Sequence, residues 1–410
     1  MGPSEAKERL FRERMRPYFP AGGAAAALLL LVVLGAVTVS DLGVAGRVLW
    51  RPVLVISSIM VTTACAQRLG VMDRITAALF VRSRGTAVRL LVFVFLLSAG
   101  TAAILNNDSA VLLLVPIVIP LVRSIYPGHP ELLIPFALVV FGAAGVAPLI
   151  VSNPMNLIVA EYVGIGFNSY AARMVPIAVV CWLVSLGAFL LVFRSVLVSA
   201  SKEHLPPAEV EPWTAPQLQS LGLLLAVLLA YPIVSYAGGP VWSVTAIGAL
   251  LALFLCARHG RGSPAHIASS DVAWEILIFM VLVSTAAIGL RDAEVVTRLS
   301  AVYADTGVPG IGGISAAGAA LINNHPMSLI NMLAIDIGAG GEHIDRILAA
   351  LIGGDLGPRL LPWGSLAGLL WYASLRRFDI HVPIRRFAFI GLVVTLPSLM
   401  VSLALLRILP

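Results

Sequence analysis

The stretch Ile104-Leu105-Asn106-Asn107-Asp108-Ser109-Ala110 places two amides and a carboxylate inside a long apolar part of the chain. Apolar residues fill 90–97 before it and 111–120 after it. In a bilayer an unpaired polar group costs several kcal/mol, and each apolar arm is shorter than the roughly 20 residues of a full crossing. The pattern predicts a re-entrant helical hairpin over residues 88–123, with Asn106, Asn107 and Asp108 at its tip.

A second stretch of the same kind lies in the other half of the chain. Asn323 and Asn324, followed by His325 and Pro326, again stand between two short apolar arms. We therefore expect a second hairpin over residues 311–338. Two such tips, one in each half, are typical of transporters built from a duplicated unit.

Composition supports a polytopic, all-α membrane protein. Of the 410 residues 59% are hydrophobic and only 12% are charged, against about 25% charged in soluble domains. The net charge of +6 comes mostly from arginines in short loops, which is the positive-inside pattern and not a nucleic-acid-binding one. We expect the charged residues 1–21 to be a cytoplasmic N-terminus and the first apolar segment to be a retained helix.

Enzyme motifs are missing from the sequence. The only lysines, Lys7 and Lys202, follow no glycine-rich loop, so the chain has no Walker A site and is not its own ATPase. It has no HExxH and no GxSxG motif either. Its three cysteines are far apart in sequence and are interpreted as small buried hydrophobes, so we expect no metal site and no cofactor: Cys65, Cys181 and Cys256.

The order of apolar segments predicts two repeats. The first, residues 22–194, has spans at 22–40 and 52–66, a surface helix within 68–89, the hairpin at 88–123, a broken helix at 132–165 and a closing span at 174–194. A polar cytoplasmic linker follows at 195–216. The second repeat, residues 217–410, has an extra span at 218–236, then spans at 240–256 and 273–290, a surface segment at 291–310, the hairpin at 311–338, a broken helix at 344–372 and a closing span at 385–408.

Both broken helices carry polar groups at the expected interruption, which lies at 148–156 in the first and at 353–358 in the second. Pro154 removes a backbone donor and is expected to bend the first of these helices. Freed backbone groups in discontinuous helices face a cavity. We therefore expect a substrate site formed by Asn106, Asn107, Ser152, Asn153, Asn156, Asn323, Asn324, Gly353 and Gly354.

Asp108 and Asp355 are the carboxylates at these interruptions. Burial in a bilayer disfavours the charged form of a carboxylate, so both are candidates for proton coupling. His325 is a further possible titrating group. The alternatives are structural: each asparagine, and Asp108 itself, could cap a helix, Asp355 could be a turn residue, and His325 could simply help to end a helix.

Positive charges predict the topology. With the N-terminus in the cytoplasm, the arginines from Arg68 to Arg89 and those from Arg376 to Arg386 fall on the cytoplasmic side. The two hairpins then enter the membrane from opposite faces. The expected architecture is an inverted repeat with two re-entrant hairpins and two broken transmembrane helices.

At these residues the chain resembles the arsenite efflux permeases, the ArsB family of the ion transporter superfamily. The resemblance is carried by four stretches: Asn107-Asp108-Ser109-Ala110 with 114–119, Leu149-Ile150-Val151-Ser152-Asn153 with 164–167, Asn323-Asn324 with Pro326, and Gly354-Asp355-Leu356-Gly357-Pro358 with 362–371. His325 and Pro154 depart from the family pattern, which is expected to have apolar residues there.

The resemblance implies export of arsenite and antimonite across the bacterial inner membrane, with proton antiport by alternating access or an elevator movement. It also allows a soluble arsenite-stimulated ATPase as a partner. The residues agree with this, because As(OH)3 is an uncharged trihydroxy solute that amides and backbone groups can bind. Two alternatives remain: a sodium-coupled carboxylate transporter or sodium/proton antiporter of the same fold, and a passive channel for neutral solutes.

Overall fold

The computed structural model describes residues 19–83, 86–200, 212–290, 294–335 and 341–409, and within these ranges the chain is helical without β-strands. Seven of its helices are long and apolar enough to cross a membrane. An eighth crossing is formed if α13 (Pro264–Ser270) and α14 (Trp274–Gly289), which are bent by 54°, count as one span. The seven are α3 (Val39–Arg68), α5 (Ala87–Leu105), α6 (Asn107–Ile125), α9 (Phe167–Val192), α11 (Ala215–Tyr236), α12 (Val241–Arg258) and α20 (Ile384–Ile408).

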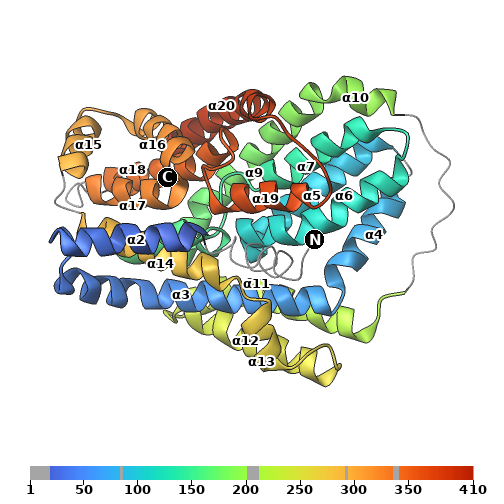
Figure 1. Ribbon diagram of the computed structural model, residues 1–410, viewed down its shortest axis with the longest axis horizontal. Coiled ribbons are helices and arrows are strands. Elements are labelled where there is room, and N and C mark those ends of the chain that lie inside the picture. The colour runs from blue at the N-terminus through green and yellow to red at the C-terminus, as the bar shows by residue number, and fades with distance from the viewer. Residues whose placement is uncertain (1–18, 84–85, 201–211, 291–293, 336–340, 410) are drawn as a thin grey trace, which may run out of the picture.

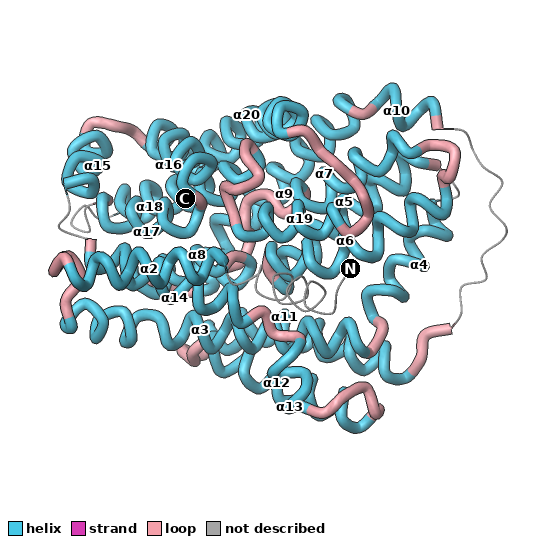
Figure 2. Tube along the Cα trace, viewed as in Figure 1, coloured by secondary structure: helices cyan, strands magenta, loops and turns pink. Residues whose placement is uncertain are grey.

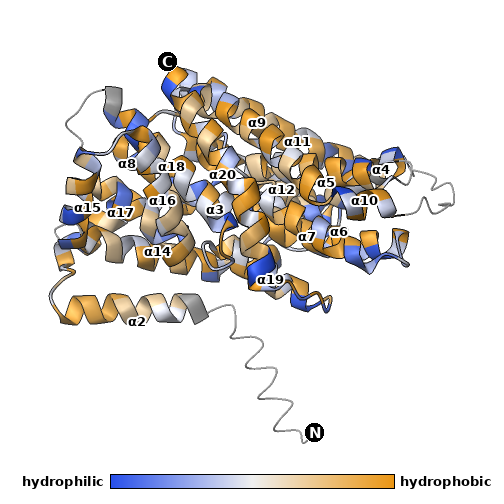
Figure 3. Cartoon of the chain, turned by 90° about the horizontal axis from the view of Figure 1, so that it is seen from above, coloured by the Kyte–Doolittle hydropathy of each residue, from blue (hydrophilic) through white to orange (hydrophobic). Residues whose placement is uncertain are grey.

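Many large apolar side chains are exposed, and Figure 3 colours much of the helical ribbon as hydrophobic, including parts of α9, α11 and α12. Leu183, Leu229 and Leu250 on these three helices are each more than 60% exposed. A water-soluble protein rarely leaves such large apolar areas uncovered. The chain is therefore a multi-pass membrane protein.

The first two helices differ from the expected spans. Helix α2 (Phe19–Val33) ends earlier than the predicted span 22–40, and α3 begins at Val39, well before the predicted start at 52. The start of α3 is fixed by Thr38 and Asp41, whose side chains cap each other's backbone N–H groups. Arg47 and Arg51 lie on an exposed face of this helix. They therefore belong to α3 and not to a loop between the first two spans.

Both predicted hairpins are present. Helices α5 and α6 meet at Asn106, and α16 (Val308–Ile322) and α17 (Asn324–Ala334) meet at Asn323. The arms of the first hairpin have 19 residues each, or about 28 Å, so each is longer than expected and long enough to cross the membrane. Those of the second have 15 and 11 residues. Figure 1 places the first hairpin at the right and the second at the left, with α19 (Leu366–Arg376) between them.

The first broken helix consists of η2 (Pro130–Leu132), α7 (Leu133–Gly142), η3 (Ile150–Ser152) and α8 (Pro154–Val163). The interruption begins at Ala143, earlier than expected. The predicted bend at Pro154 is wrong, because Pro154 is the first residue of α8 and follows the capping residue Asn153. Proline is well suited to this position, where its missing N–H would have had no helical partner.

The second broken helix consists of α18 (Gly341–Leu356), η4 (Gly357–Arg359) and α19. The predicted interruption at 353–358 was placed too early, since Gly353, Gly354 and Asp355 lie in the last turns of α18. The reason is packing: a Cβ on Gly353 would collide with the carbonyl oxygen of Gly312 on α16. These glycines allow two helices to approach closely and do not break α18.

The short helices connect the spans. Helix α4 (Val71–Ser83) and helix α15 (Glu294–Ala304) lie within the two predicted surface segments. The predicted linker 195–216 begins with α10 (Arg194–Ser199), and its residues 201–211 lie outside the described part. Figure 2 shows the loops of the broken helices beside α8 and α19 near the centre of the molecule.

The second arm of each hairpin packs against a helix of the other half of the chain. The second arm of the first hairpin, α6, lies against α19 of the second half, and the second arm of the other hairpin, α17, lies against α8 of the first half. Each first arm lies against the interruption of its own half, α5 on η3 and α16 on η4. This exchange is the packing of an inverted-repeat transporter. The repeat boundaries at 22–194 and 217–410 stay a prediction.

Candidate substrate site

The two hairpin tips share one backbone geometry. Asn106 and Asn323 have φ values of 98° and 87° with extended ψ values of 163° and 144°, a combination that residues with a side chain rarely adopt. The Asn106 Oδ1 accepts the N–H of Ser109 at 2.8 Å, and the Asn323 Oδ1 accepts the N–H of His325 at 3.1 Å. Both asparagines therefore cap the second arm of their hairpin, as the structural alternative expected.

Hydrogen bonds attach each tip to the interruption in its own half. The Ser152 hydroxyl donates to the carbonyl of Ala103 in α5 at 2.7 Å. In the second half, the Asn323 Nδ2 donates to the carbonyl of Trp363 at 3.0 Å. The backbone N–H of Asn324 donates to the carbonyl of Gly364 at 2.7 Å. Both tips are thus hydrogen-bonded to the backbone of neighbouring segments.

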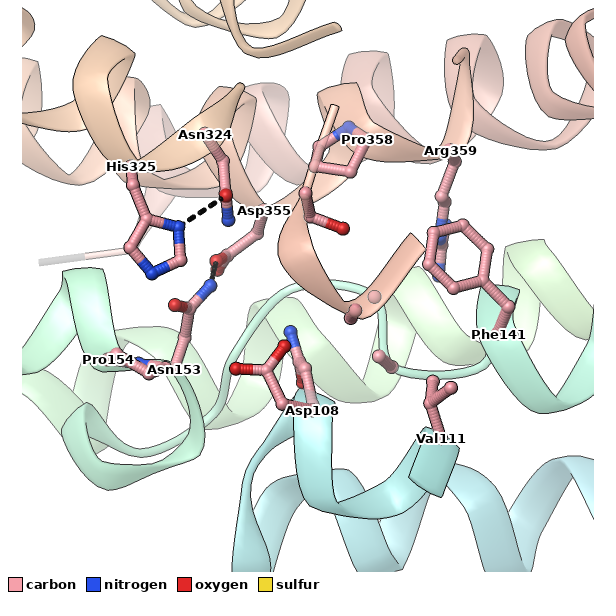
Figure 4. A pocket seen from close by; sticks show the side chains of 15 residues that line it. Asp108, Val111, Phe141, Asn153, Pro154, Asn324, His325, Asp355, Pro358 and Arg359 are labelled. Carbon is pink, nitrogen blue, oxygen red and sulfur yellow. Dashed lines mark hydrogen bonds between the residues drawn. The ribbon is translucent and has the colours of Figure 1, made fainter. Parts of the chain in front are cut away.

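The polar interruptions enclose a small cavity of about 30 Å³, which has room for water-sized groups. Figure 4 shows Asp108 entering it from α6, while Asn324, His325 and Asp355 enter from the opposite side. Of the predicted residues, those that line the cavity are Asn107, Asp108, Asn153, Asn324, His325 and Asp355.

Asp355 is the most completely bonded group at this site. Its Oδ1 accepts the Asn153 Nδ2 at 2.6 Å, and its Oδ2 accepts the Asn156 Nδ2 at 3.0 Å and the backbone N–H of Ala147 at 2.9 Å. Asn156 also donates to the hydroxyl of Tyr170, at 2.7 Å. Since all three partners of Asp355 are N–H donors, the arrangement suits a carboxylate that keeps its charge.

Asp108 is buried but incompletely bonded. It is 4% exposed, and the backbone N–H of Ala367, in the first turn of α19, donates to it. Its Oδ2 has no hydrogen-bond partner. An unpaired buried oxygen is unfavourable unless something fills the place, so Asp108 has a free position for a proton or for a hydroxyl group of a solute.

His325 stands in the second tip where Asp108 stands in the first, two residues after the capping asparagine. Its Nδ1 lies 2.9 Å from the Asn324 Oδ1, while its Nε2 is buried without a partner. The ring lies edge-on to Phe279, with 5.9 Å between the ring centres. With Nδ1 donating to the amide oxygen, Nε2 presents a lone pair that can accept a hydrogen bond.

The remaining predicted residues do not line the cavity in the described structure. Asn106 and Asn323 cap the tips, although the Asn106 Nδ2 is left without a partner. Ser152 donates to the carbonyl of Ala103 in the first hairpin, and Asn156 donates to the Asp355 carboxylate, which itself lines the cavity. Gly353 and Gly354 do not line it either, and a Cβ on Gly354 would lie 2.9 Å from the Ser328 hydroxyl oxygen.

Sequence reasoning missed Arg359. This arginine is 5% exposed, lines the cavity and follows Asp355 by four residues. It donates to the Ser185 hydroxyl at 3.0 Å and to the carbonyl of Gly142. Its charge acts on the Asp355 carboxylate. The available signal was an arginine just after the Gly353–Pro358 stretch, inside an otherwise apolar segment.

A bundle of membrane-spanning helices, in which two hairpin tips and two interrupted helices surround a buried polar cavity, is the architecture of a membrane transport protein. Comparison with known proteins identifies the family. The sequence profile of the arsenical pump membrane protein family, ArsB, matches residues 17–409. The chain belongs to this family.

Individual relatives agree with the assignment. The chain is 30% identical to the arsenical pump membrane protein of Escherichia coli K12 over 391 residues, which are 92% of this chain and 90% of that one. It is 25% identical to a putative arsenical pump membrane protein of Bacillus subtilis strain 168, over 85% of each chain.

A solved structure shares the fold. The YdaH transporter of Alcanivorax borkumensis, described as having an unusual topology, matches with a TM-score of 0.61 over 95% of this chain and 98% of that one. Because the two sequences are only 16% identical, this likeness concerns the fold alone.

Proposed function

We propose that this protein exports arsenite, as As(OH)3, and antimonite in exchange for protons. Family membership supports arsenical transport. The observation that carries the coupling is Asp108, a buried carboxylate with one unpaired oxygen, at a cavity whose other polar lining includes amides, the His325 imidazole and the pair Asp355 and Arg359. A proton and a solute hydroxyl group would compete for the same oxygen, and such competition is what an antiporter requires.

The cavity chemistry supports an uncharged cargo. Asp355 and Arg359 carry opposite charges in the same cavity, so together they contribute no net charge. The groups left for the solute are the Asp108 Oδ2, the His325 Nε2 and the amides of Asn107 and Asn324. Three hydroxyl groups of As(OH)3 can donate to the oxygen and the imidazole nitrogen and accept from the amides.

Location and orientation complete the proposal. We infer a bacterial inner-membrane protein with a cytoplasmic N-terminus, because arginine-rich segments collect on one side of the predicted spans. Export then runs from the cytoplasm outward. The permease would act as a proton antiporter either alone or together with a soluble arsenite-stimulated ATPase.

The test uses everted membrane vesicles that contain the full chain. Arsenite and antimonite should accumulate when a proton gradient is present, in sodium-free buffer, and accumulation should stop when the gradient is collapsed. Asp108→Asn should abolish gradient-driven accumulation. Asp379→Asn, which removes an exposed carboxylate from the loop after α19, is the matched control and should keep it.

Each rival function gives a different result in the same vesicles. Accumulation that needs sodium would support the sodium-coupled alternative. Arsenite that equilibrates but never accumulates would support a passive channel. Undiminished accumulation with the proton gradient collapsed and no ATPase present would refute the antiport.

A further inference from the structure

A groove separate from the polar cavity lies between α19 and the beginning of α20. It has a volume of about 610 Å³ and a mostly apolar lining. The apolar part includes Leu369 and Ile384, which are 40% and 49% exposed. The rest of its lining includes Pro362, Trp363, Tyr372, Ala373, Arg376, His381 and Arg385.

The groove is held in shape by bonds on two sides. The Tyr372 hydroxyl donates to the carbonyl of Val382, which attaches α19 to the loop before α20. At the other end, the carbonyl of Trp363 accepts the Asn323 Nδ2 of the second hairpin tip. The walls therefore come from segments fixed to one another, and the groove is part of the fold.

Basic side chains surround one end of the groove. Arg376, Arg385 and His381 are exposed, and the Arg376 guanidinium lies 5.9 Å from the centre of the Tyr372 ring. Among the described residues, no carboxylate forms a salt bridge with either arginine. This end of the groove thus has two arginines that form no salt bridge in the described part of the chain, next to an apolar channel.

We propose that the groove binds one anionic phospholipid, with an acyl chain along Leu369 and Ile384 and the phosphate between Arg376 and Arg385. Helix α20 has 25 residues and spans the membrane from Ile384, so its first turn lies at the level of the lipid headgroups. Basic pockets at this level are suited to anionic headgroups. The apolar channel can hold an acyl chain, which a soluble phosphate ion does not have.

The occupant would touch the scaffold of the transport site. The groove ends at Pro362 and Trp363, in the loop that holds Asn323. Helix α19 forms its other wall, and the first turn of this helix donates to Asp108. A lipid seated there would therefore stabilise the two segments that hold the polar groups of both hairpin tips in place.

The test measures lipid binding to the purified full-length protein by native mass spectrometry, with phosphatidylglycerol and phosphatidylcholine of identical chains in competition. The unmodified protein should retain phosphatidylglycerol preferentially. The double variant Arg376→Gln/Arg385→Gln should bind it about 30-fold more weakly, from the contribution typical of two basic side chains near anionic lipid. Arg194→Gln/Arg407→Gln removes two exposed arginines elsewhere and should bind as the unmodified protein does.

A second variant tests the apolar half. Ala373→Trp fills the groove without a change of charge, and it should reduce the preference to that of the arginine double variant. If Ala373→Trp binds phosphatidylglycerol normally, lipid binding depends on surface charge alone, and the groove site is refuted. Equal loss in both arginine double variants would refute it too. A change of oligomeric mass in the Arg376/Arg385 variant would assign the groove to a second copy of the chain and overturn the proposal.

Discussion

The two buried aspartates should respond differently to the same substitution. In Asp355→Asn, the new side chain keeps one oxygen, which can accept from Ala147 and Asn156 as the Oδ2 does now. Its amide nitrogen then faces the Asn153 Nδ2, at the position where the Oδ1 accepts at 2.6 Å. Asn153 cannot turn its amide round without giving up the N–H of Met155, which its Oδ1 caps. Two donors are thus brought face to face.

The cost follows from the hydrogen bonds. An unsatisfied buried donor costs about 1–3 kcal/mol, and bonds to a neutral acceptor are weaker than bonds to a carboxylate by about 1 kcal/mol. Arg359 also loses the charge that balances it. We expect Asp355→Asn to lower the free energy of unfolding by about 2–5 kcal/mol. In Asp108→Asn the amide oxygen can keep the hydrogen bond from the Ala367 N–H, and the amide nitrogen takes the place of the Oδ2. Because the Oδ2 already lacks a partner in the unmodified protein, no hydrogen bond is lost, and the free energy of unfolding should change by less than about 1 kcal/mol.

The assay compares thermal unfolding of both variants in one detergent with arsenite accumulation in vesicles. Asp355→Asn should unfold at clearly lower temperature, while Asp108→Asn should unfold like the unmodified protein and still fail to accumulate arsenite. The reasoning is refuted if Asp108→Asn is the less stable of the two. It is also refuted if Asp355→Asn unfolds at the original temperature.

Two further predictions concern single backbone positions. A Cβ on Gly391 of α20 would overlap the carbonyl oxygen of Arg359, whereas one on Gly313 of α16 meets open space; Gly391→Ala should therefore sharply reduce the folded yield measured by size-exclusion chromatography, and Gly313→Ala should be neutral or stabilising by up to about 1 kcal/mol. Asn106→Ala loses the cap on Ser109 and keeps a strained φ of 98°, so it should cost about 1–3 kcal/mol in thermal unfolding. Asn106→Gly relieves the strain and should cost less, and equal losses in the two variants would show that φ is not the cause.

The tips could be predicted because their signal is local. An asparagine pair between apolar runs has few interpretations in a membrane, and both Asn106 and Asn323 are turn residues between helices. The second interruption was misplaced because Gly353 looked like a helix breaker. Its actual role, the approach of α18 to α16, depends on Gly312, which is 41 residues away in sequence, and no local pattern contains that information.

Contacts between segments that are distant in the sequence could not be predicted from the sequence. Cys65 and Cys256 were interpreted only as small buried hydrophobes far apart in the sequence, and the structure places the Cys256 Sγ 3.7 Å from the carbonyl oxygen of Cys65, where α3 and α12 pack together. Arg359 was missed for a similar reason. Its partners Ser185 and Gly142 come from α9 and α7, and a buried arginine can only be interpreted once its acceptors are known.

The charges in the cavity suggest how exchange could be made obligatory. If Asp355 and Arg359 stay ionised and balance each other, the net charge of the site depends on Asp108 alone. A site with an ionised, unpaired Asp108 is unfavourable to bury while the site changes its exposure from one side of the membrane to the other. A proton removes the charge, and a bound hydroxyl-bearing solute satisfies the free oxygen. On the proposed antiport, we infer that either of these states can reorient while the empty, ionised site cannot, which would couple the entry of protons to the exit of the neutral solute.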